Sequence, residues 1–127
     1  MIDHVSLFAN DLIAARTFYQ QALAPLGYEL IAQIPNAEDP FVIGFGEKGK
    51  PDLWIAKGPS GHVQHVALRA ATRKVVQAFH AAALAAGGKD NGAPGVRPHY
   101  HPNYYGGFII DADGHNVEAV CHDAYLE

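Results

Sequence analysis

His4-Val5-Ser6-Leu7 recurs as His65-Val66-Ala67-Leu68, 61 residues further along the chain. The same offset aligns four more pairs of identical residues, which are Phe18 and Phe79, Ala22 and Ala83, Leu23 and Leu84, and Gly27 and Gly88. Matches at several separated places indicate a duplicated structural unit. Each copy begins with an apolar segment that carries a histidine, so two copies paired around a shared cavity would bring imidazoles together.

The composition indicates one globular domain and excludes several classes of partner. The 127 residues are 49% apolar and 17% charged, which is typical of a chain with its own core. The net charge of −4 and the lack of a Lys/Arg cluster predict that nucleic acid is not a partner. No apolar run approaches the roughly 18 residues that span a bilayer, so we expect no membrane partner. One cysteine and no signal-like N-terminal segment predict a cytoplasmic location.

The pattern of apolar residues and turn residues predicts the same order of elements in both copies. In the first copy we expect a strand over 2–8, a helix capped by Asn10 or Asp11 that stops at Gly27, and strands over 28–34, 41–45 and 52–57. In the second copy we expect a strand over 62–69, a helix that follows Thr72 and ends at Gly87-Gly88, an irregular segment over 89–102, and a hairpin of 104–111 and 115–122. The second strand of the later copy is therefore expected to be weak or absent.

These elements predict an α+β fold made of two βαβββ modules, residues 1–57 and 62–127, in a single domain. The modules would pair into a curved mixed sheet around a central cavity, with the helices on the outside. The link between them is Gly58-Pro59-Ser60-Gly61.

Strand alternation places three metal-binding side chains on one face of the predicted sheet. Val5, Val66 and Val117 belong to the apolar faces that pack beneath the helices. The opposite face then carries His4, His65 and Glu118. In an alignment of the last hairpin with its partner in the first copy, Glu118 has Trp54 as its counterpart. An indole does not bind metal, so a site here has three protein ligands.

The sequence resembles the vicinal oxygen chelate superfamily, which includes glyoxalase I, type I extradiol dioxygenases, and fosfomycin and bleomycin resistance proteins. The resemblance rests on His4-Val5-Ser6-Leu7, Phe18-Tyr19, His65-Val66-Ala67-Leu68 and the segment Asp111-Ala112-Asp113-Gly114-His115-Asn116-Val117-Glu118. The last segment is similar to the family's Asp-Pro-Asp-Gly turn before a metal-ligating glutamate, with Ala112 in place of proline. The match covers nearly the whole chain and is specific for the fold rather than the reaction.

The resemblance implies that His4, His65 and Glu118 bind a divalent ion such as Fe(II), Mn(II), Ni(II) or Zn(II). The ion would act as a Lewis acid toward an enediolate-like intermediate or as the seat of O₂ activation. Because the glyoxalase pattern has four protein ligands, Trp54 argues against standard lactoylglutathione lyase activity. Related proteins pair these modules within or between chains, and we expect a homodimer.

Several other side chains are candidates for binding or catalysis. In the segment 97–105, Arg97 could hold an anionic group, and His101 or Tyr105 could transfer a proton; the alternative is a rim loop whose tyrosines only pack. Trp54, Phe8 and Phe41 could line a substrate pocket. Arg69 could meet an anionic substrate or pair with a carboxylate. His80 and His115 are expected to face solvent, and Cys121 to be a buried, inert thiol.

The sequence leaves three function classes open. The first is a metal-dependent enzyme, a lyase, isomerase, dioxygenase or thiol transferase, that acts on a small substrate with vicinal oxygens. The second is a metal-free protein that binds a small molecule, such as a drug or antibiotic, in the same cavity. The third is a scaffold whose sheet edges serve for assembly.

Overall fold

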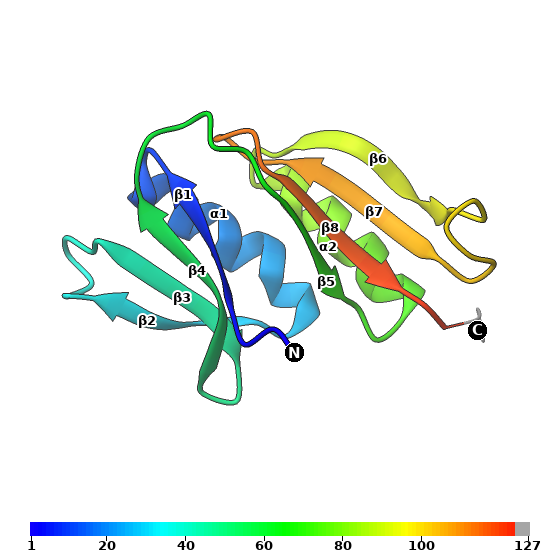
Figure 1. Ribbon diagram of the computed structural model, residues 1–127, viewed down its shortest axis with the longest axis horizontal. Coiled ribbons are helices and arrows are strands. Elements are labelled where there is room, and N and C mark those ends of the chain that lie inside the picture. The colour runs from blue at the N-terminus through cyan, green and yellow to red at the C-terminus, as the bar shows by residue number, and fades with distance from the viewer. Residues whose placement is uncertain (124–127) are drawn as a thin grey trace.

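The computed structural model describes residues 1–123, and this part of the chain contains eight strands and two α-helices (Figure 1). The first module consists of β1 (Val5–Ala9), α1 (Leu12–Leu23), the short 3-10 helix η1 (Ala24–Leu26), β2 (Glu29–Ile34), β3 (Val42–Glu47) and β4 (Lys50–Lys57). The second consists of β5 (His65–Arg69), α2 (Arg73–Ala85), β6 (Lys89–Val96), β7 (Tyr105–Ile110) and β8 (Asn116–Cys121). The predicted α+β fold with two βαβββ modules is confirmed.

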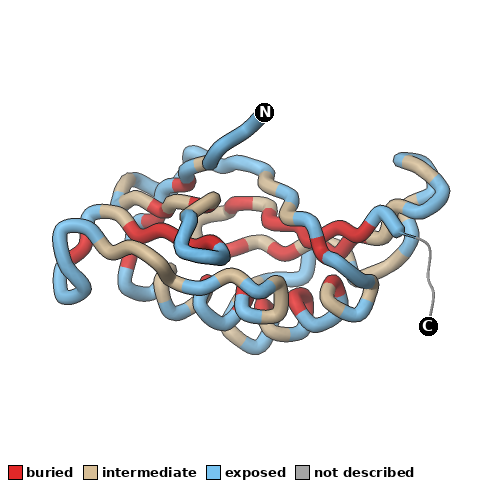
Figure 2. The backbone as a smooth tube through the Cα atoms, turned by 90° about the horizontal axis from the view of Figure 1, so that it is seen from below, coloured by how far each residue is buried: buried red, intermediate tan, exposed pale blue. Residues whose placement is uncertain are grey.

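Each module forms its own four-stranded mixed sheet, with the orders β1-β4-β3-β2 and β5-β8-β7-β6. The first strand of each module lies parallel to the last, and the other neighbours are antiparallel. Both sheets are open, and no described strand of one is hydrogen-bonded to a strand of the other. In Figure 1 both helices lie behind the sheets, and Figure 2 shows this layering from the side. We call the sheet faces turned away from the helices the open faces.

Local capping sets the start of both helices. The side chain of Asp11 accepts a hydrogen bond from the backbone N–H of Ala14, and Thr72 does the same for Val75. These bonds satisfy backbone donors that have no partner within the helix. Gly27 ends η1 with a φ of 82°. Of the described helices, none is long and apolar enough to cross a membrane.

The segment Lys89–Val96 corrects one prediction, because it forms strand β6 rather than an irregular loop. Two glycines and Pro94 remove the alternation of apolar side chains that usually marks a strand. The pairing of β6 with β7 is irregular, with register shifts on both sides of Gly92. This segment therefore forms a strand because its backbone pairs with β7, although its side-chain pattern does not indicate a strand.

The core lies between the helices and the inner faces of the two sheets. Its fully buried side chains come from both modules, among them Leu23, Phe45, Phe79, Ile109 and Val117. The two helices also contact each other, which joins the modules on that side. Cys121 is buried on the helix side, as predicted.

His115 corrects a second prediction, because its side chain is buried with 1% of its surface exposed. The backbone N–H of Gln64 donates to its Nδ1 at 3.1 Å, so its Nε2 donates to the carbonyl of Phe8 at 2.7 Å. The imidazole thus joins β1 of one module to the segment before β5 of the other. His80 is also buried rather than exposed, and its Nε2 lies 3.0 Å from a carboxylate oxygen of Asp90.

Candidate metal and substrate site

The strand registers place Trp54 and Glu118 at equivalent positions of the two sheets. Ser6 of β1 pairs with Trp54 of β4, and Ala67 of β5 pairs with Glu118 of β8. Ser6 and Ala67 are themselves equivalent in the repeat of the sequence. The structure therefore supports the alignment that assigns an indole to one open face and a carboxylate to the other.

His65 and Glu118 meet on the open face of the second sheet. Nε2 of His65 lies 2.9 Å from Oε1 of Glu118, and Glu118 is only 1% exposed. The side chain of His65 is half exposed. Two donor atoms at this separation can both reach one divalent ion at about 2.0–2.2 Å, so this pair fits two ligands of a metal site.

Tyr104 holds the other oxygen of the Glu118 carboxylate, and the sequence analysis did not single it out. Its hydroxyl donates a hydrogen bond to Oε2 of Glu118. Burial and this bond raise the pKa of Tyr104 above its usual value, so the hydroxyl stays a donor at neutral pH. A Cβ at Gly106 would lie 3.0 Å from the same Oε2, so the glycine leaves room for the carboxylate. Tyr104 precedes Phe108, the cross-strand partner of Glu118, by an even number of residues, so strand alternation favours the same face for both. This spacing points to Tyr104 only once the pairing of Phe108 with Glu118 is known.

Tyr105 lies on the opposite side of the sheet from Glu118. Its hydroxyl accepts a hydrogen bond from the Gln77 side chain of α2 at 2.8 Å, and the guanidinium of Arg73 lies over its ring. Its cross-strand partner is Cys121, which faces the helices. The structure thus brings Tyr104, rather than its neighbour, to the carboxylate.

His101 and His122 form a hydrogen-bonded imidazole pair beside this carboxylate. Nε2 of His101 lies 2.6 Å from Nδ1 of His122, and the backbone N–H of Asn103 donates to Nδ1 of His101. His101 therefore donates through Nε2, and His122 accepts. A cavity of about 410 Å³ is lined by His65, Tyr100, His101, Tyr104, Glu118 and His122.

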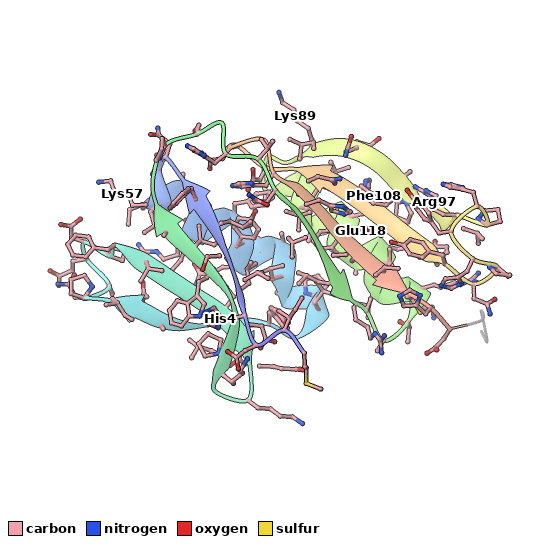
Figure 3. The ribbon with its side chains drawn as sticks, viewed as in Figure 1. His4, Lys57, Lys89, Arg97, Phe108 and Glu118 are labelled. Atoms are coloured by element: carbon pink, nitrogen blue, oxygen red, sulfur yellow. The ribbon has the colours of Figure 1, made fainter. Side chains whose placement is uncertain are left out.

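His4 does not join His65 and Glu118 within one chain. Its Nδ1 lies 2.7 Å from a carboxylate oxygen of Asp3. A groove of about 480 Å³ has both His4 and His65 in its lining, but not Glu118. Figure 3 shows His4 at the start of β1 and Glu118 on the other sheet. Among residues 1–123, no three His, Cys, Asp or Glu side chains are close enough together to hold a metal ion.

The predicted pocket residues are spread over both sheets. Trp54 lies against Gly44, where a Cβ would come within 2.9 Å of the indole. Phe8 and Phe41 are exposed, and Arg69 is exposed at the end of β5. Arg97 lies over the ring of Phe108, with its guanidinium carbon 5.5 Å from the ring centre.

The sequence model of the Glyoxalase/Bleomycin resistance protein/Dioxygenase superfamily matches residues 1–119. The chain belongs to this superfamily. The match includes the first module, most of the second and both residues of the His65–Glu118 pair, so the expected family is confirmed. The comparison with curated proteins finds no match.

Solved structures share the fold over nearly the whole length of this chain. A glyoxalase/bleomycin resistance protein from Albidiferax ferrireducens has a TM-score of 0.77 at 24% identity, covering 97% of this chain and 99% of that one. The fosfomycin resistance protein FosX from Listeria monocytogenes, solved with Mn(II) and 1S,2S-dihydroxypropylphosphonic acid, has a TM-score of 0.68 at 19% identity, covering 94% and 88%. Lactoylglutathione lyase from Agrobacterium tumefaciens has a TM-score of 0.67 at 18% identity, covering 95% and 92%. At these identities the likeness establishes the fold alone.

Proposed function

We propose that the protein is a divalent-metal-dependent enzyme of the glyoxalase/extradiol-dioxygenase type that acts on a small substrate with vicinal oxygens. The observation that carries this proposal is the 2.9 Å approach of the His65 imidazole to the buried carboxylate of Glu118 on an open sheet face. A buried carboxylate is costly unless it is compensated by partners or by a cation. Tyr104 and His65 give it hydrogen bonds, and His65 also leaves one side of the pair accessible from the cavity.

The proposed ligands are His65, Glu118 and His4. Two imidazoles and one carboxylate suit Fe(II), Mn(II), Ni(II) or Zn(II) and leave positions for two substrate oxygens. When bound, the ion would supply Lewis-acid chemistry or a site for O₂. The indole of Trp54 at the counterpart of Glu118 supports a three-ligand site and argues against a four-ligand lactoylglutathione lyase.

We propose that a second copy of the chain supplies His4. Within one chain His4 lies on the first sheet, away from Glu118, while the open faces of both sheets point in the same direction (Figure 1). In a dimer with two-fold symmetry every contact between the copies occurs twice. The first sheet of each copy can therefore lie against the second sheet of the other. Phe8, which alternates with the buried Leu7 and Ala9 and is exposed on the open face of the single chain, would be covered in such a homodimer.

The remaining polar groups of the cavity would bind and orient the substrate. Tyr104 would hold the Glu118 carboxylate by Oε2 and leave Oε1 for the ion. His101 would transfer a proton through Nε2, which in the free protein donates to His122. The vicinal hydroxyls of the ligand present in FosX together with Mn(II) support a substrate with neighbouring oxygens.

Mixing of two inactive variants tests both the metal site and the dimer. His4→Ala and Glu118→Gln, each purified as the full chain, are expected to bind no stoichiometric metal. After they are mixed under conditions that exchange subunits, the heterodimer should hold one intact site, which contains His4 from the Glu118→Gln chain and Glu118 from the His4→Ala chain. Metal content measured by mass spectrometry should then rise to about one ion per mixed dimer.

The same experiment separates the alternatives. Metal retained by either single variant excludes the proposed ligand set, and absence of metal in the unmodified protein under every divalent supplement favours a metal-free binding protein. If both single variants lose metal and mixing restores none, the site is completed within one chain.

A further inference from the structure

We propose that Arg97, seated in a gap of β6, is an anion-binding group for the substrate at the metal site. The inference rests on the proposed function and adds a substrate class to it. The substrate would carry its metal-chelating oxygens at one end and an acidic group at the other, joined by a flat apolar segment.

Two glycines of β6 make the seat for the guanidinium. A Cβ at Gly95 would lie 3.0 Å from one terminal nitrogen of Arg97, and a Cβ at Gly92 would lie 3.2 Å from the other. The pairing of β6 with β7 shifts register between these two glycines. Regular pairing is therefore interrupted where the side chain of Arg97 folds back over its own strand.

Two contacts fix the orientation of Arg97. One terminal nitrogen donates to the carbonyl of Ala93 at 2.7 Å, and the guanidinium lies over the ring of Phe108. A guanidinium stacked on a ring keeps its remaining N–H groups free at the edge of its plane. Within the described part of the chain, no carboxylate is within ion-pair distance of Arg97. The positive charge is thus held in place without an anionic partner.

Phe108 joins this cation to the metal ligands. It is the cross-strand partner of Glu118 in β7 and β8, and its ring centre lies 6.2 Å from that of His65. In Figure 3, Glu118, Phe108 and Arg97 follow one another in space, from β8 through β7 to the end of β6. Strands are about 4.8 Å apart, so an acidic group on Arg97 would lie about 10 Å from the ion. A ligand of that length would pass along the ring of Phe108, between His65 and Arg97.

The test compares an acid with its neutral ester. The probes are 3,4-dihydroxyphenylacetate and its methyl ester, titrated calorimetrically into Zn(II)-loaded protein, because Zn(II) does not change its oxidation state. We expect the acid to bind the unmodified protein at least about tenfold tighter than the ester, as a charge-assisted hydrogen bond allows. In Arg97→Gln the two affinities should differ by less than about twofold, with the ester affinity retained.

Two further variants separate position from charge. Gly95→Ala keeps the arginine but places a Cβ in its seat, and it should also reduce the preference for the acid. Arg16→Gln is the control, because Arg16 bonds to Gln33 and to the carbonyl of Ala37 rather than lying on the site. It should leave the preference unchanged.

The possible failures are distinguishable. An unchanged preference in Arg97→Gln, or its loss in Arg69→Gln instead, overturns the assignment of Arg97 while the metal site stands. Equal binding of acid and ester by the unmodified protein overturns it too. Failure of the unmodified protein to bind Zn(II) or either probe counts against the proposed function itself.

Discussion

The two modules have the same scaffold but opposite distributions of large and small side chains on their open faces. In the first sheet Trp54 of β4 lies over Gly44, its partner in β3. In the second sheet the aromatic ring is on β7, where Phe108 pairs with Glu118 of β8. The exchange leaves space and a buried carboxylate on one face and an indole on the other. A duplicated scaffold can therefore make its two open faces chemically different by placing one aromatic ring on a neighbouring strand.

The largest effect is expected from replacement of the carboxylate itself. Glu118→Gln keeps the shape of the side chain but removes the charge, so metal affinity should fall by at least about 100-fold, more than is typical of groups that only contact a ligand. Trp54→Phe changes the equivalent position of the first sheet and should leave affinity within about twofold. Calorimetric titration with Zn(II) measures both. Equal losses in the two variants would remove the functional difference between the faces.

Loss of the imidazole that joins the modules should be the next largest effect. His115→Ala leaves the carbonyl of Phe8 and the N–H of Gln64 without their buried partner, so the free energy of unfolding should fall by about 3 kcal/mol. Urea denaturation measures it. His99→Ala, in the exposed loop after β6, is the matched control and should change stability by less than about 0.5 kcal/mol. A similar change in both variants would show that His115 does not join the modules energetically.

Tyr104 should matter to the metal, whereas its ring neighbour Tyr100 should not. Tyr104→Phe removes the hydrogen bond to Oε2 of Glu118, and metal affinity should fall about 10- to 100-fold. Tyr100→Phe removes a hydroxyl from the same cavity without removing a bond to Glu118 and should leave the affinity unchanged. Zn(II) titration of the two variants checks this. An unaltered affinity in Tyr104→Phe would contradict the positioning role.

A smaller effect, on the pH dependence of the free energy of unfolding, is expected for Tyr19. This residue is equivalent to His80 in the repeat. Its hydroxyl donates to Asp111 of the other module at 2.5 Å, and burial raises the pKa of Tyr19 above its usual value. Because the folded pKa exceeds the unfolded value near 10, its contribution to stability is complete below pH 10 and is lost as the pH rises further. Tyr19→Phe should flatten the fall of stability above pH 10, by at most about 1.4 kcal/mol per pH unit. Denaturation curves from pH 9 to 11 measure it, with Tyr100→Phe as control; parallel curves for Tyr19→Phe and the unmodified protein would contradict it.

The sequence predicted the two modules because apolar alternation and helix caps are local signals. Asp11, Thr72 and Gly27 act through bonds to residues a few positions away, and the structure contains those caps. The pairing of Ala67 with Glu118 agrees with the alignment that makes Trp54 the counterpart of this carboxylate. Local signals did not predict β6, because this strand forms through backbone pairing with β7 rather than through a side-chain pattern of its own.

The burial of individual polar groups depended on contacts between distant segments, which no local pattern reports. His115 is in a turn, where exposure is the usual outcome. It is buried because its imidazole is hydrogen-bonded to the carbonyl of Phe8, 107 residues earlier in the sequence. Tyr104 and Tyr105 are adjacent and chemically the same, and only the orientation of β7 against β8 decides which one meets Glu118.

By itself, the sequence determined the duplicated βαβββ scaffold, the superfamily and the face on which His65 and Glu118 lie, because strand periodicity converts residue spacing directly into direction. The tertiary structure decided that these two side chains meet, that His4 stays apart from them, and that Arg97 is seated beside Phe108. Those outcomes depend on how separate strands pack and shift against one another, and such distances are set by the assembled fold rather than by any stretch of the chain.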